Sequence, residues 1–254
     1  MGNEAANPIR SVERTFEIIE ALQRLDGAGV TELSEHLGIP QSTVHNYLST
    51  LEQEEYAVND DGEYRVGIRF LELGAYARNR RKLYDIAKPE VERLAAETGE
   101  LANLLVEEHG RGTYLQRARG EQAVQVEAHV GTRVSLHSTA LGKAILAHLP
   151  ASRVDEILEL HGLTARTDNT VSSREELSTQ LTEVRERGYA FDDEERISGL
   201  RCVAAPVLSN DDRVLGAVSV SGPSHRIRGE RFRETLPNVL LEAVNVIELN
   251  VTHS

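Results

Sequence analysis

A run of short polar side chains between positions 41 and 50 carries the chemistry needed to read DNA. Hydroxyl, amide and imidazole groups can hydrogen-bond to base edges and phosphate oxygens, and the run supplies Gln41, Ser42, Thr43, His45, Asn46, Ser49 and Thr50. Val44, Leu48 and Leu51 interrupt it at the i, i+4, i+7 spacing of one helical face. The sequence therefore predicts a helix with a buried apolar face and a polar face that suits the major groove.

The residues before this helix predict the element that must brace it. Leu33 and Leu37 give an apolar side to a short helix. Gly38 suits the left-handed turn that would follow, and Pro40 suits the first turn of the next helix, where its missing N–H is not needed. Residues 31–51 thus read as a helix-turn-helix. A pair of surface helices in an unrelated fold is the alternative.

The flanking segments extend this reading to a winged helix. An amphipathic helix is expected over residues 11–25, with Val12, Phe16, Ile19 and Leu22 on its apolar face. Two β-prone runs, 56–58 and 64–66, flank a strong turn sequence at 59–62 and predict a hairpin. We expect a DNA-binding domain over residues 1–67 whose contacts come from Thr31, Gln41, Ser42, Thr43, His45, Asn46 and Arg65.

Composition limits the class of protein. The 254 residues are 40% hydrophobic, so the chain can bury a real core in one large or two modest domains. It has no apolar run of membrane-spanning length and no signal-peptide core near its start. Its single cysteine, Cys202, cannot form an internal disulfide. We expect a cytoplasmic protein without a membrane partner.

The charge is unusual for a DNA-binding protein, because affinity for DNA comes largely from neutralised phosphates. The net charge is −13, and residues 1–75 hold five arginines against fourteen acidic residues. Only three of the 28 basic residues are lysines. Abundant acid with so little lysine suggests a salt-loving host, where screening suppresses repulsion. A GC-rich genome is the alternative, but it explains the arginine and not the excess acid.

The rest of the chain predicts a linker helix and an α+β domain. The linker is expected at residues 68–82; its basic end, 78–82, either touches the DNA backbone or is a solvated helix end. A helix at 83–98 is expected to break or begin at Pro89. In the domain over 83–254 we expect an antiparallel meander with strands at 101–107, 113–119 and 123–129, then helices at 138–148, 152–161 and 172–187, a strand opening at 188–191, a hairpin at 201–208 and 214–221, and a helix at 228–251.

Four blocks together resemble the IclR family of transcription regulators, over residues 12–248. They are GVTELSEHLGIPQSTVHNYLSTLEQEEY in the winged helix, then LHSTALGKAILAHLP, RERGYAFDDEERISGLRCVAAPV and LGAVSVSGP. The resemblance implies a winged helix-turn-helix joined to a GAF-like effector domain with an antiparallel sheet. It also implies assembly as homodimers and often tetramers. This chain departs from many family members by carrying Asn46, a good reader of adenine, where they carry arginine.

The resemblance also implies the effector-binding residues. Ser138, Thr139 and Ala140 match a helix start whose backbone N–H groups meet a ligand carboxylate. On the strands that follow, the matching positions are Asp192, Leu200, Cys202, Ser219 and Ser221. Each has a structural alternative: a small buried thiol, hydroxyls on a solvated sheet face, or a carboxylate in a solvated acidic loop.

The sequence thus predicts a regulator that binds double-stranded DNA at a near-palindromic operator. Its effector is expected to be a small organic acid, and no cofactor or metal is expected. Three alternatives stay open. One is an enzyme with Cys202 as nucleophile, His137 or His225 as base and Asp192 as the group that orients it. Another is a metal sensor using His137, Asp192 and Cys202. The last is an architectural DNA protein with a sensor domain that no longer binds a ligand.

Overall fold

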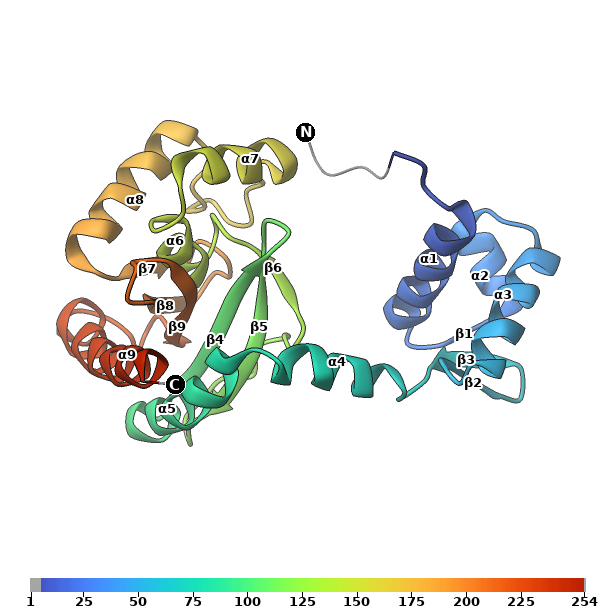
Figure 1. Cartoon of the computed structure of the whole chain (residues 1–254), viewed down its shortest axis with the longest axis horizontal. Coiled ribbons are helices and arrows are strands. Elements are labelled where there is room, and N and C mark those ends of the chain that lie inside the picture. The colour runs from blue at the N-terminus through green and yellow to red at the C-terminus, as the bar shows by residue number, and fades with distance from the viewer. Residues whose placement is uncertain (1–5, 254) are drawn as a thin grey trace. The chain divides into compact units, whose positions relative to one another are not determined.

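The computed structural model describes residues 6–253, which fall into two compact units (Figure 1). The boundary between the units lies between Ala77 and Arg78. It falls inside helix α4 (Phe70–Asn79), which occupies most of the expected linker. The described residues contain no helix long and apolar enough to cross a membrane.

The N-terminal unit has the helix and strand order of a winged helix. Its elements are α1 (Arg10–Leu25), β1 (Ala28–Gly29), α2 (Val30–Leu37), α3 (Gln41–Gln53), β2 (Ala57–Asp60) and β3 (Glu63–Val66), with the strands in the order β1-β3-β2. Gly38 ends α2 with a φ of 65°, as the turn requires. Pro40 caps α3 from outside and is not part of its first turn. The two-residue strand β1 was not predicted.

The apolar face of α1 was only partly predicted. Ile18, Ala21 and Leu22 are fully buried, whereas the side chains of Val12 and Phe16 are 48% and 55% exposed. Apolar residues in this helix define two overlapping stripes, and the packed stripe follows the i, i+3, i+4 spacing from Ile18. Periodicity alone does not say which of two such stripes meets the core.

The wing hairpin is tighter than expected. The strands run through Asn59 and Asp60, so the turn consists of Asp61 and Gly62 alone. Both have positive φ, 50° and 93°, which a two-residue hairpin turn of this kind requires. The Asn59 side chain accepts a hydrogen bond from the Gly62 N–H at 2.9 Å.

The C-terminal unit is built on a six-stranded antiparallel sheet with the order β6-β5-β4-β9-β8-β7. Its strands are β4 (Leu101–Glu108), β5 (Arg111–Arg119), β6 (Arg133–Ser135), β7 (Ala190–Asp193), β8 (Leu200–Leu208) and β9 (Val214–Pro223). Its helices are α5 (Lys82–Thr98), α6 (Ala140–Leu146), α7 (Ala151–His161), α8 (Arg174–Arg187) and α9 (Leu236–Thr252), with one π-helical turn at Arg231–Thr235.

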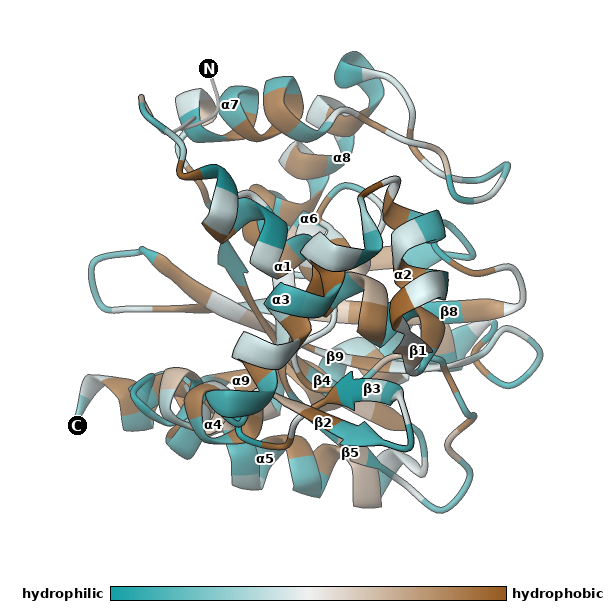
Figure 2. Cartoon of the chain, turned by 90° about the vertical axis from the view of Figure 1, so that its right-hand side faces the viewer, coloured by the Kyte–Doolittle hydropathy of each residue, from teal (hydrophilic) through white to brown (hydrophobic). Residues whose placement is uncertain are grey.

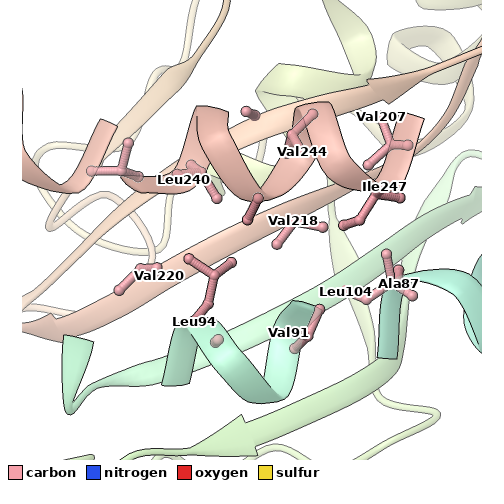
Figure 3. Packing of buried hydrophobic residues seen from close by; sticks show 14 of the residues in the cluster. Ala87, Val91, Leu94, Leu104, Val207, Val218, Val220, Leu240, Val244 and Ile247 are labelled. Atoms are coloured by element: carbon pink, nitrogen blue, oxygen red, sulfur yellow. The ribbon is translucent and has the colours of Figure 1, made fainter. Parts of the chain in front are cut away.

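Each face of this sheet carries its own hydrophobic core. On one face α5 and α9 lie side by side, and residues such as Val91, Leu94 and Leu240 pack against the strands (Figure 3). On the other face α6 packs on the sheet and α8 packs on α6, through residues such as Leu141 and Leu177. Ser173 caps α8 by accepting a hydrogen bond from the Glu176 N–H.

Two sequence expectations about this unit are wrong. Residues 123–129 form no strand, because the short strand β6 pairs with the free edge of β5 instead. Pro89 lies inside α5 and does not break it. Its side chain is exposed, so the carbonyl of Asp85, which has lost its helical donor, faces water.

Candidate nucleic-acid interface and effector cavity

The polar face of α3 is open to solvent. Gln41, Ser42, His45 and Asn46 are exposed and Thr43 is half-buried. Val44, Leu48 and Leu51 on the opposite face are buried against the rest of the N-terminal unit. This arrangement leaves hydroxyl, amide and imidazole groups free to meet base edges while the apolar face fixes the helix. Thr31, in the first turn of α2, is exposed as well.

The wing carries an acidic tip. Arg65 is exposed on β3, but its guanidinium donates two hydrogen bonds, of 3.0 and 2.8 Å, to the carboxylate of Glu63. Asp60 and Asp61 are exposed at the turn, and the hairpin is hydrophilic throughout much of its length (Figure 2). These bonds use Nε and Nη2 of Arg65, so the N–H groups of Nη1 can still donate to a phosphate.

A β-bulge shapes the cavity on the α6 face of the C-terminal sheet. Tyr114 pairs with Leu105 and Arg117 pairs with Asn103, so β5 contains one more residue than β4 between these pairs. Leu105 and Asn103 are two residues apart and share a face. The bulge therefore brings Tyr114 and Arg117 to the same face, although simple alternation would separate them.

Polar side chains from several elements meet in this cavity. Those that line it are Asn103, Tyr114, Arg117, Thr139, Asp192, Arg196, Cys202 and Ser221, with Leu101, Val126, Leu141 and Leu200 as apolar walls. The enclosed volume is about 20 Å³, room for one water molecule. Two of the lining residues are joined directly, since Arg196 donates a 2.6 Å hydrogen bond to the Tyr114 hydroxyl.

The structure brings together five of the eight expected effector positions. Asp192, Leu200, Cys202, Ser221 and Thr139 line the cavity. The other three do not line it, although all are buried: Ser138, Ala140 and Ser219. Asp192 was expected on a middle strand but belongs to the edge strand β7, where its backbone pairs with Cys202 on β8.

Seven cavity residues were missed by sequence reasoning: the apolar Leu101, Val126 and Leu141, and the polar Asn103, Tyr114, Arg117 and Arg196. The four polar residues matter most for ligand binding. They form one chain of contacts. Arg117 donates to the Asn103 carbonyl oxygen at 3.1 Å, and the Asn103 amide donates to the Ser219 hydroxyl at 3.2 Å. The guanidinium carbons of Arg117 and Arg196 both lie close to the Tyr114 ring, 5.3 and 5.7 Å from its centre.

The acidic groups behind the cavity are strongly affected by burial. Desolvation, with the nearby Glu195 carboxylate, raises the pKa of Asp192 to about 7. The Asp192 carboxylate accepts a 2.8 Å hydrogen bond from the Glu195 N–H. The side chain of Glu195 is buried against Lys143, which also donates to Gln180 at 2.9 Å.

The surroundings of Cys202 argue against the enzyme alternative. Complete burial raises the pKa of its thiol to about 12, so the nucleophilic thiolate is disfavoured. The Ser221 hydroxyl lies 3.1 Å from its sulfur. No group of three or more metal-ligating side chains occurs anywhere in residues 6–253.

Comparison with known proteins identifies the family. The model of the IclR helix-turn-helix domain matches residues 11–61, and the model of the bacterial transcriptional regulator IclR C-terminal domain matches residues 75–248. The chain belongs to the IclR family. It is therefore a DNA-binding transcriptional regulator with a C-terminal ligand-binding domain, and its relatives are regulators and not enzymes.

Relatives match this IclR-family chain along nearly all of its length. A probable HTH-type transcriptional regulator, ArcR, of Halobacterium salinarum is 36% identical over 99% of both chains. The transcriptional repressor IclR of Escherichia coli is 31% identical over 91% of this chain and 86% of its own. The crystal structure of the Thermotoga maritima IclR has a TM-score of 0.78 at 29% identity, over 95% of this chain and 98% of that one.

Proposed function

We propose that this regulator senses a small organic acid in the cavity between the sheet and α6. The observation that carries the proposal is the meeting of two guanidinium groups, Arg117 and Arg196, with hydroxyl and amide groups in an otherwise apolar cavity. Guanidinium pairs with carboxylate in a planar, two-bonded geometry. An IclR homologue of Microbacterium hydrocarbonoxydans, which shares the fold at 24% identity and a TM-score of 0.79, was crystallised with 4-hydroxybenzoate.

The ligand enters by displacing one contact. A cavity of about 20 Å³ is too small for any organic acid. Arg196 closes it from the loop between β7 and β8, and its side chain is only half-buried. Rotation of that side chain away from Tyr114 opens the site, and the same guanidinium then binds the ligand. Arg196 thereby exchanges a neutral hydrogen-bond partner, the Tyr114 hydroxyl, for the charged carboxylate of the effector.

The protein acts on DNA as a homodimer, either alone or as one half of a tetramer. Apolar side chains are exposed on α1 and α4 of the N-terminal unit: Ile9, Val12, Phe16, Leu71, Leu73 and Tyr76. Leu71 and Tyr76 are 74% and 71% exposed, which favours their burial against a second copy. A two-fold dimer presents two copies of α3, so its operator is a near-palindrome with half-sites about one helical turn apart.

Effector binding is transmitted along the linker. We propose functional boundaries at 1–67 for the DNA-binding domain, 68–82 for the linker and 83–254 for the effector domain. Effector binding changes the spacing of the two recognition helices through α4 and so shifts operator affinity. DNA is contacted by Thr31, Gln41, Ser42, Thr43, His45, Asn46 and Arg65. Since its target is the chromosome, the protein works in the cytoplasm.

Thermal-shift screening in 2 M KCl tests the sensor. A panel of small carboxylates, including 4-hydroxybenzoate, is compared on the parent chain and on Ser221→Ala. Ser152→Ala, an exposed hydroxyl on α7, is the matched control. We expect at least one acid to raise the melting temperature of the parent and the control, and to raise that of Ser221→Ala less. Equal shifts in all three proteins would place the ligand outside this cavity.

Selection of bound duplexes from a random DNA library tests the interface. We expect a near-palindromic consensus, and a different preference for the bases read by α3 in Asn46→Ala. Asn59→Ala, on wing strand β2, is the control for indirect effects on the domain. An asymmetric consensus would contradict the dimeric operator. Light scattering on Leu71→Asp tests assembly: the variant should be monomeric in conditions where the parent is a dimer.

A further inference from the structure

We infer that the effector is a dicarboxylate and that Arg117 and Arg196 together select it over monocarboxylates. The inference rests on the proposed function of this cavity and names the class of acid that it binds. It starts from the guanidinium groups of Arg117 and Arg196, which both lie near the Tyr114 ring and whose positive charges lie close enough to repel each other.

Neither guanidinium is neutralised by the protein. Across residues 6–253, Arg117 and Arg196 form no ion pair with an Asp or Glu side chain. Their hydrogen-bond partners are neutral: the Asn103 amide for Arg117 and the Tyr114 hydroxyl for Arg196. Several other arginines of this unit do bind an acidic side chain; Arg201, for example, binds Asp193 at 2.6 Å. A half-buried cation without a counter-ion destabilises the folded protein, and two such cations close together destabilise it further.

The acids nearest to the cavity do not supply the missing charge. Asp192 is the only carboxylic acid among the lining residues of the described chain, and its carboxyl interacts with Glu195 and Lys143. Glu195 itself is held by Lys143. The remaining titratable lining groups, Cys202 and Tyr114, are held neutral by burial, which raises the pKa of each. Two negative charges from a ligand would therefore neutralise the two guanidinium groups.

The walls of the cavity indicate how those charges are carried. Leu101, Val126, Leu141 and Leu200 are apolar, and they suit a short carbon skeleton between two carboxylates. Each planar carboxylate can take a two-bonded contact from one guanidinium. The hydroxyl of Ser221 and the carboxyl of Asp192 line the same cavity and are then available to a keto or hydroxyl group on the skeleton.

Isothermal titration in 2 M KCl tests the inference with chain-length-matched pairs of probes. Malonate, succinate and phthalate are compared with propionate, butyrate and benzoate, and inorganic phosphate serves as an anion without a carbon skeleton. We expect a dicarboxylate to bind at least 10-fold more tightly than its monocarboxylate partner. Charge-assisted hydrogen bonds of this kind account for factors of about 10 to 100.

Four arginine variants complete the test. Arg117→Gln and Arg196→Gln should each abolish the preference for the dicarboxylate while monocarboxylates still bind. Arg119→Gln, an exposed position on the same strand, should leave it unchanged. Arg196→Lys keeps the charge without the planar fork and should give an intermediate preference. Arg117 donates a hydrogen bond to Asn103, so Arg117→Gln could fail to fold; in that case Arg196→Gln and Arg196→Lys carry the test.

The outcomes separate this inference from the proposed function. If monocarboxylates bind as tightly as dicarboxylates, or if the Gln variants keep the preference, the effector is an organic acid but the two-charge selection is wrong. Tighter binding of phosphate than of any carboxylate would replace the dicarboxylate by a phosphorylated ligand. If no anion binds the parent chain, both the cavity's sensor role and the selection are refuted.

Discussion

Asp192 makes the stability of this protein depend on pH in an unusual direction. Its carboxyl group is buried, and desolvation together with Glu195 raises its pKa from 3.8 to about 7. In the unfolded chain the group ionises near pH 4, whereas in the folded protein it keeps its proton until about pH 7. Between these values the folded state binds more protons, so the free energy of unfolding falls as pH rises.

The size of the effect follows from the shift. The rise in pKa from 3.8 to about 7 lowers the free energy of unfolding by about 4 kcal/mol once the pH exceeds both values. The loss is gradual, and about 2 kcal/mol of it falls between pH 5 and pH 7. The substitution Asp192→Asn places a neutral amide at this position at every pH, and the amide oxygen can still accept the 2.8 Å bond from the Glu195 N–H.

Urea unfolding at several pH values measures this. The free energy of unfolding of Asp192→Asn should equal that of the parent near pH 4 and exceed it at pH 7.5, by up to about 4 kcal/mol. Asp168→Asn, on the exposed loop before α8, should follow the parent at every pH. The reasoning about Asp192 is refuted if the free energy of unfolding differs between Asp192→Asn and the parent by the same amount at every pH. It is also refuted if the stability of the variant relative to the parent falls between pH 4 and pH 7.5.

Three further perturbations test other parts of the fold. Glu100 is fully buried, and its carboxylate accepts hydrogen bonds of 3.0 and 2.7 Å from Arg226. Glu100→Ala should lower the free energy of unfolding by about 3 kcal/mol, measured by urea unfolding. Glu97→Ala, which removes an ion pair on the surface, should lower it by less than about 0.5 kcal/mol in the same assay. Gly142→Ala should lower the melting temperature markedly, because its Cβ would lie 2.0 Å from the Leu136 carbonyl oxygen; Gly74→Ala, with open space around it, should not. With a net charge of −13, the melting temperature of the parent should rise between 0.1 and 2 M KCl; a fall would contradict a surface adapted to salt.

The elements of this fold were largely predictable where local signals are strong. The turn at Gly38 and the cap at Ser173 each rest on a residue whose own chemistry fixes the backbone nearby. Predictions failed where the outcome depends on distant partners. Whether residues 123–129 pair with β5 is decided by β6, which occupies that edge. Which stripe of α1 is buried is decided by the helices that pack against it.

The cavity was predicted only in part, because its decisive residues are placed by tertiary structure. Family resemblance supplied Asp192, Cys202 and Ser221, which do line it. Nothing local marks Arg196, which reaches the cavity from a loop.

Arg117 shows the physical reason most clearly. Strict alternation along β5 would put Tyr114 and Arg117 on opposite faces, one in each hydrophobic core. The register shift opposite Leu104 and Leu105 reverses Arg117, so that it meets Tyr114 and Arg196 on the α6 side. One extra residue in a strand therefore decides whether a positive charge faces the ligand or the apolar core under α5. Since a bulge is fixed by both paired strands, the charge of this cavity is a property of the folded sheet and not of any short motif.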